Sequence, residues 1–161
     1  MINILLTGKP GVGKTTLIQR ILRISKLKPG GFYTQEIRER NARVGFEIIT
    51  LSGQRGILSH INVKSPYRVG KYRVHLEDLD RVAVVEIWRA LREEELVVID
   101  EIGKMELFSE KFKQAVLAAL NSEKPVLGTI MLGSTAFVDT IKRPGRRYRS
   151  KIGNLIVLSF K

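Results

Sequence analysis

One segment near the N-terminus combines glycines, a lysine and a threonine at spacings that suit phosphate binding. The stretch Gly8-Lys9-Pro10-Gly11-Val12-Gly13-Lys14-Thr15 matches the pattern G-x-x-x-x-G-K-[ST] at every fixed position, and Thr16 follows it near the site. Glycines let the backbone curl so that successive N–H groups face phosphate oxygens, which a Cβ atom would obstruct. Lys14 can reach the β- and γ-phosphates as a point charge, and the Thr15 hydroxyl is a hard oxygen ligand for Mg²⁺. The segment predicts a nucleoside triphosphate site with Mg²⁺; the alternative is a glycine-rich turn without a ligand.

A pair of carboxylates, Asp100 and Glu101, follows the apolar run 96–99. Ligands of parallel α/β sheets bind at the carboxyl ends of the strands, where this pair falls. We expect Asp100 to hold Mg²⁺, directly or through water, and Glu101 to orient and deprotonate an attacking water. A solvated strand end is the alternative.

The residues after this pair, Ile102, Gly103 and Lys104, complete the expected nucleotide-binding set. Asp100 to Gly103 also fit the pattern D-x-x-G of GTPases, but no guanine-reading N-K-x-D segment follows. We therefore expect loose selectivity for the base.

The elements that must position these residues alternate between strands and helices. The hydrophobic pattern predicts strands at 2–6, 32–38, 43–51, 96–99, 126–131 and 155–160, and helices at 14–26, 78–93, 109–120 and 135–142. Near-continuous apolar strands that alternate with helices indicate a mainly parallel sheet covered on both faces. A polar turn at 39–42 makes the second and third strands an antiparallel hairpin at one edge, and 59–70 is expected to be a loop.

Composition limits the class of protein. The chain has 161 residues, enough for one domain over 1–161, and its 43% hydrophobic and 27% charged residues are typical of a globular protein. A formal charge of +12 favours anionic partners, and the absence of cysteine excludes disulfides, thiolate metal sites and a cysteine nucleophile. No apolar run is long enough to span a membrane and no signal peptide is evident, so we expect a cytoplasmic monomer that does not act at a membrane.

Longer matches identify a family. They are the segments Gly31-Phe32-Tyr33-Thr34-Gln35-Glu36-Ile37-Arg38, Gly45-Phe46, Thr50-Leu51-Ser52-Gly53, Val69-Gly70-Lys71-Tyr72 and Val98-Ile99-Asp100-Glu101-Ile102-Gly103-Lys104-Met105-Glu106-Leu107-Phe108-Ser109. With the glycine loop, they resemble the nucleoside-triphosphatase family of thermophiles and animals, also called cancer-related nucleoside triphosphatase, over residues 1–143. The resemblance implies Mg²⁺-dependent hydrolysis of ATP, GTP, CTP and related triphosphates. It also implies a three-layer P-loop fold with RecA-like strand order and an additional catalytic glutamate.

The resemblance suggests that strand 126–131 lies between the Asp-Glu strand and the loop strand. Thr129 on that strand is then a candidate sensor of the γ-phosphate, or simply a polar residue in a buried strand. Thr34, Glu36 and Arg38 share one face of their strand, either as paired surface charges or as part of the nucleotide site.

Six cations lie within residues 142–151, among them Arg146 and Arg147, with Tyr148 between them and Arg149. Three interpretations remain open: a solvated basic loop, an arginine supplied to the bound nucleotide, or a contact with nucleic-acid phosphates in which Tyr148 stacks on a base. The leading hypothesis for the whole chain is a nucleoside triphosphate hydrolase. Its alternatives are a P-loop kinase of the nucleoside-kinase type and a nucleotide-gated nucleic-acid-binding protein.

Overall fold

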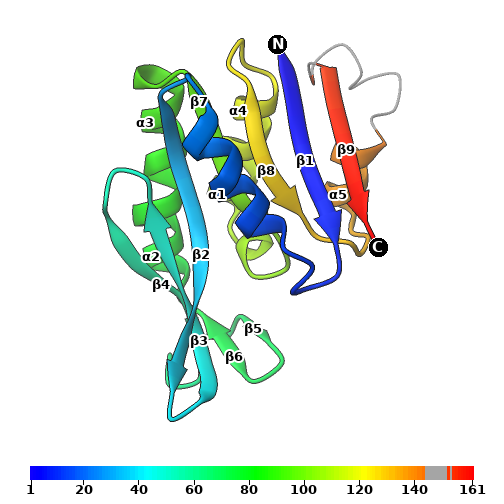
Figure 1. The fold of residues 1–161 in the computed structure, drawn as a ribbon. Coiled ribbons are helices and arrows are strands. Elements are labelled where there is room, and N and C mark those ends of the chain that lie inside the picture. Colours follow the sequence, from blue (N-terminus) through cyan, green and yellow to red (C-terminus); the bar gives the residue numbers. More distant parts are fainter. Residues whose placement is uncertain (144–151, 153) are drawn as a thin grey trace.

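The computed structural model describes residues 1–143, 152 and 154–161. The strands among these residues form one nine-stranded mixed sheet (Figure 1). The strand order is β5-β6-β4-β3-β2-β7-β8-β1-β9. The strands are β1 (Ile2–Gly8), β2 (Pro29–Glu39), β3 (Ala42–Thr50), β4 (Arg55–His60), β5 (Arg68–Val69), β6 (Tyr72–Val74), β7 (Leu96–Ile102), β8 (Val126–Ile130) and β9 (Asn154–Phe160). The helices are α1 (Lys14–Ile24), α2 (Leu76–Asp78), α3 (Val85–Glu93), α4 (Glu110–Leu120) and α5 (Ala136–Lys142).

One half of the sheet is parallel. Strand β7 pairs in parallel with β2 and β8, and β1 pairs in parallel with β8 and β9. Strand β8 therefore lies between β7 and β1, which confirms the predicted RecA-like order. The carboxyl ends of β1, β8 and β7 consequently meet at one edge of the sheet.

The apolar run at the start of β7 shows why both faces of the sheet are covered. Val97 and Ile99 are fully buried in a cluster that includes Phe112 of α4. Val98 is fully buried in a second cluster, with Ile18 of α1. Because successive side chains of a strand point to opposite faces, two separate layers of helices require a continuous run of apolar residues.

The antiparallel half is larger than the predicted hairpin. Strands β2 and β3 pair as predicted, but β3 pairs further with β4, and β4 and β5 pair with β6. The loop predicted at 59–70 was wrong at its two ends, where β4 reaches His60 and β5 takes Arg68–Val69. Gly56 interrupts the alternation of apolar residues that would have indicated β4. A side chain is excluded there because an added Cβ would lie 2.9 Å from Val82 Cγ2.

The helix predicted at 78–93 is continuous but not uniform. A π-helical segment, η1 (Leu79–Val84), separates α2 from α3. Helix α4 begins as its sequence predicts, because the Ser109 side chain caps it by accepting the N–H of Phe112 over 3.0 Å. Among the described residues, no helix is both long enough and apolar enough to cross a membrane.

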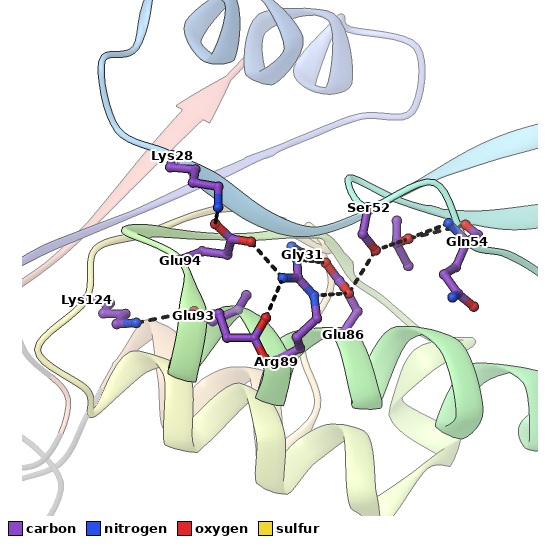
Figure 2. Close-up of polar contacts among 11 residues, drawn as sticks. Lys28, Gly31, Ser52, Gln54, Glu86, Arg89, Glu93, Glu94 and Lys124 are labelled. Carbon is purple, nitrogen blue, oxygen red and sulfur yellow. Dashed lines mark hydrogen bonds and ion pairs between the residues drawn. The ribbon is translucent and has the colours of Figure 1, made fainter.

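A network of charged side chains on α3 fixes the start of β2 (Figure 2). The Arg89 guanidinium donates to Glu86 Oε1 over 2.7 Å and to Glu94 Oε1 over 2.6 Å. Glu86 also accepts the N–H of Gly31 on β2, over 3.3 Å, and the hydroxyl of Ser52 in the turn after β3, over 3.1 Å. The network joins α3 to β2, near its amino end, and to the turn after β3.

Candidate active site

The glycine loop lies between β1 and α1, as the motif requires. Strand β1 ends at Gly8, and Lys14 is the first residue of α1. Gly11 and Gly13 have φ angles of +79° and +94°, in the left-handed region that side chains other than glycine rarely adopt. No side chain caps the start of α1, so its first N–H groups and its positive dipole end remain available to an anion.

Lys14 points back over the loop that precedes it. Its Nζ donates to the carbonyl oxygens of Gly8 and Lys9, over 3.0 and 2.9 Å. The ammonium charge is therefore held against the loop main chain, beside the uncapped N–H groups of α1. Free N–H groups at a helix start beside an ammonium group are donors of the kind that can bind an anion.

Asp100 is the buried member of the carboxylate pair. Only 2% of its surface is exposed, and its Oδ1 accepts the hydroxyl of Thr129 over 2.6 Å. Its Oδ2 has no hydrogen-bond partner among the described residues. Burial raises the pKa of Asp100, against the lowering effects of the Thr129 and Thr15 hydroxyls and of the Lys14 charge. Thr129 and Thr15 thus act on Asp100 from β8 and from the start of α1.

Glu101 is the half-buried member of the pair. Burial raises its pKa, the Asp100 charge raises it further, and the Lys14 charge lowers it. The sequence pattern predicts that Asp100 and Glu101 follow the strand 96–99. In the structure the strand is longer, and both residues lie within β7. A register shift between Ile99 and Ile102 interrupts the pairing of β7 with β8 at these two residues.

A pocket of about 760 Å³ brings the loop and Glu101 together. Nine of the predicted residues line it: Gly8, Pro10, Gly11, Gly13, Lys14, Thr15, Thr16, Glu101 and Lys104. Ile102 instead lies in the hydrophobic core, fully buried, and Asp100, which is also buried, is not part of the pocket lining. Lys9, Val12 and Gly103 belong to the same loops without lining the pocket.

The pocket extends onto the antiparallel half of the sheet. Its lining there comprises Thr34 and Glu36 of β2, Arg43 and Phe46 of β3, Leu58 of β4 and Val69 of β5, with Met105 from the loop after β7. Thr34 and Glu36 therefore line the pocket, while Glu36 also pairs with Arg38 over 2.9 Å. The Glu36–Arg38 ion pair fits the interpretation as paired surface charges, and a role of this strand face in nucleotide binding stays a prediction.

Sequence reasoning missed Glu106 as a site residue. Glu106 is 3% exposed, yet it lines the pocket. Burial raises its pKa well above the ordinary value, and the charges of Glu101 and Asp100 raise it further. An added Cβ at Gly103 would meet the carboxylates of both Glu101 and Glu106, so these two side chains flank the same glycine. The available signal was a glutamate between Met105 and Leu107, in a segment otherwise apolar.

The oxygen donors of the site fit a magnesium ion. The structure holds no cluster of three or more metal-ligating His, Cys, Asp or Glu side chains within residues 1–143, 152 and 154–161. Mg²⁺ needs fewer protein ligands, since it retains water and binds substrate phosphates beside one or two carboxylates. The unpartnered Oδ2 of Asp100 and the hydroxyl of Thr15 suit such an ion. Arg146 and Arg147, the predicted arginine candidates, lie outside the described residues.

Comparison with known proteins gives consistent matches. The profile of a family described as NTPase matches residues 3–154. Nucleoside-triphosphatase THEP1 of Thermotoga maritima is 52% identical over 139 residues, which cover 86% of this chain and 79% of the relative. A cancer-related nucleoside-triphosphatase homolog of Bos taurus is 43% identical over 144 residues, covering 82% and 74%.

Two solved structures share the fold. The crystal structure of THEP1 from Aquifex aeolicus is 34% identical with a TM-score of 0.81, and the match covers 99% of this chain and 89% of the other. The solution structure of a human cancer-related nucleoside triphosphatase is 37% identical with a TM-score of 0.77, covering 100% and 89%.

Proposed function

The chain belongs to the nucleoside-triphosphatase family, and from this premise we propose that it hydrolyses nucleoside 5′-triphosphates to the diphosphate and phosphate in a Mg²⁺-dependent reaction. The observation that carries the proposal is the position of Asp100 and Glu101. Glu101 lines one pocket with Lys14 and the glycine loop, and Asp100, its neighbour in β7, has a carboxylate oxygen without a partner among the described residues. This arrangement supports binding of a triphosphate tail opposite a metal ligand and a base.

The loop and Lys14 supply most of the electrostatic stabilisation. Phosphoryl transfer depends on positioning and charge neutralisation more than on covalent chemistry. The main-chain N–H groups at the start of α1 donate to the phosphates, and the Lys14 ammonium neutralises the β- and γ-oxygens. Thr15 and Asp100 are the residues that would hold Mg²⁺, which supplies further positive charge at the β- and γ-phosphates.

Glu101 is the proposed general base. A base is most effective when its pKa lies near the working pH, and burial beside Asp100 moves the pKa of Glu101 in that direction. The Glu101 carboxylate accepts a proton from the water that attacks the γ-phosphorus in line with the leaving oxygen. Since no guanine-reading segment occurs in the sequence, we include ATP, GTP and CTP among the substrates.

The test is phosphate release from ATP, GTP and CTP with Mg²⁺, in the wild type and in three variants. Lys14→Ala is expected to weaken both nucleotide binding and turnover. Glu101→Gln should bind nucleotide nearly as the wild type does but lose turnover by a factor on the order of 10² to 10⁴, the usual contribution of a general base. Glu123→Gln, exposed in the turn before β8, is the matched control. Unimpaired turnover in Glu101→Gln would reject Glu101 as the base.

A further inference from the structure

The pocket has two parts, and β7 runs between them. Strands β8 and β1, with the glycine loop, lie on one side of β7, and β2, β3 and β4 lie on the other. The pairing of β2 with β7 ends at Tyr33 and Asp100, after which β2 continues with β3. Figure 1 shows this hairpin extending past the end of β7. Neighbouring strands are about 4.8 Å apart, so β1 and β3 each lie roughly 10 Å from β7. Glu101 therefore lies about midway along the pocket.

The second part, here called the hairpin compartment, is lined by Thr34, Glu36, Arg43, Phe46, Leu58, Val69 and Met105. In-line transfer requires the attacking oxygen to approach the γ-phosphorus opposite the leaving oxygen. When the phosphates lie on the loop and Glu101 lies beside the attacking oxygen, the nucleobase of the triphosphate extends away from Glu101. If the nucleobase instead occupied the hairpin compartment, the phosphate nearest Glu101 would be the α-phosphate rather than the γ-phosphate. The compartment consequently lies on the attacking side of the γ-phosphate.

The side chains of the hairpin compartment suit a ring with hydroxyl groups. Phe46 offers an aromatic ring that is fixed in place. Its centroid lies 5.4 Å from that of Tyr72 in an edge-to-face arrangement, and the Arg43 guanidinium lies over its face, 5.1 Å from the centroid. Leu58, Val69 and Met105 add apolar surface, and Thr34 adds a hydroxyl.

Glu36 and Arg43, the charged residues of the compartment lining, pair with each other. Glu36 accepts from Arg43 over 3.0 Å and from Arg38 over 2.9 Å. These two guanidinium groups hold the pKa of Glu36 below its ordinary value, so it stays an anion between them. An uncharged molecule therefore suits the compartment better than a highly charged one. The whole pocket, of which the compartment is one part, has a volume of about 760 Å³. This volume lies toward the upper end for small-molecule sites, so the pocket has room for a second molecule beside a triphosphate tail.

We propose that the hairpin compartment binds a nucleoside as an acceptor for the γ-phosphoryl group, an inference that rests on the proposed function. The 5′-hydroxyl oxygen forms a bond to the γ-phosphorus as the bond from phosphorus to the β–γ bridging oxygen breaks. The electron pair of that bond leaves with the nucleoside diphosphate, and the hydroxyl proton passes to the Glu101 carboxylate. The products are a nucleoside monophosphate and a nucleoside diphosphate. Water takes the place of the hydroxyl when the compartment holds no nucleoside, which gives hydrolysis.

In the test, the protein is incubated with [γ-³²P]ATP, Mg²⁺ and one of five nucleosides: adenosine, guanosine, cytidine, uridine or thymidine. The radioactive label shows where the γ-phosphoryl group goes. Chromatography separates free phosphate from labelled monophosphate. At least one nucleoside is expected to give saturable transfer. Phe46→Ala is expected to lower the ratio of transfer to hydrolysis about tenfold, the effect of losing one ring-stacking contact. Val69→Trp, which fills the compartment, should lower the same ratio. Trp88→Ala, on the outer side of α3 with the side chain 40% exposed, should leave both activities unchanged.

The outcomes separate this inference from the proposed function. Hydrolysis of ATP without transfer to any of the five nucleosides would overturn the acceptor site and leave the hydrolase intact. Transfer that Phe46→Ala and Val69→Trp both leave unchanged would place the acceptor elsewhere and also overturn it. Absence of both hydrolysis and transfer would overturn the proposed function, and the acceptor site with it.

Discussion

The Thr129 hydroxyl on β8 donates to Asp100 Oδ1 on β7 over 2.6 Å, and Asp100 Oδ2 has no partner among the residues described. One oxygen of the carboxylate is thus fixed in position while the other stays free to accept. Thr129 was a candidate sensor of the γ-phosphate, but its hydroxyl is directed at Asp100. Under the proposed function, in which Asp100 holds Mg²⁺, Thr129 would act on the ion by orienting that carboxylate.

Thr129→Val keeps the shape of the side chain and removes this donor. Because the hydroxyl favours the charged form of Asp100, its loss is expected to raise the pKa of Asp100 further and to weaken Mg²⁺ binding about 10- to 100-fold. The measurement is the Mg²⁺ concentration that gives half-maximal hydrolysis. Thr140→Val, at a half-buried position of α5, is the control, and an unchanged Mg²⁺ dependence in Thr129→Val would contradict the proposed role.

Hydrolysis should decline in acid at a pH above the ordinary glutamate pKa of about 4.3. Burial and the Asp100 charge raise the pKa of Glu101, and only the deprotonated carboxylate can accept a proton. Activity is therefore present above the raised pKa and is lost as the pH falls through it. The measurement is kcat against pH, with circular dichroism to show that the fold persists. The residual activity of Glu101→Gln should lack this acid limb, and an identical limb in both proteins would assign it to another group.

Glu106→Gln is expected to stabilise the protein at neutral pH. Burial and two neighbouring carboxylates raise the pKa of Glu106, so the folded chain binds its proton more tightly than the unfolded chain does. The stability from this group is complete below the unfolded pKa of about 4.3 and is lost as the pH rises toward the folded value. Glutamine resembles the protonated acid and does not titrate. The Tm advantage of the variant should be a few degrees near pH 7 and shrink toward pH 4. The control is Glu123→Gln, at an exposed position in the turn before β8.

Local spacing was enough to find the parts of the site that are continuous in sequence. The glycine loop and the Asp100-Glu101 pair each follow an apolar run, so the ends of these strands, and the residues there that line the pocket, could be recognised without tertiary information. The order of β7, β8 and β1 came from the family resemblance and is confirmed.

What could not be predicted depends on contacts between distant segments. Glutamate is usually found on protein surfaces, so the residue type of Glu106 does not suggest burial. Only the packing of the folded chain shows that Glu106 is a buried acid. Strand β4 escaped detection because Gly56 makes room for Val82 of η1, which no local pattern reports. No local pattern in α3 reports that Glu86 accepts the N–H of Gly31 on β2, 55 residues away in the sequence.

Arg89→Met is expected to lower the Tm by on the order of 5 °C, through loss of the network that joins α3 to β2. Arg89 is the cation between Glu86 and Glu94, whose side chains are each 5% exposed, and its removal leaves these carboxylates without their guanidinium partner. Methionine keeps the apolar stem of the side chain, so the loss reports the charge rather than the packing. The measurement is thermal unfolding at neutral pH. Arg92→Met, one turn further along α3 and outside this network, is the control. If Glu86→Gln combined with Arg89→Met restores part of the lost stability, the uncompensated Glu86 charge is the cause; no recovery would refute that explanation.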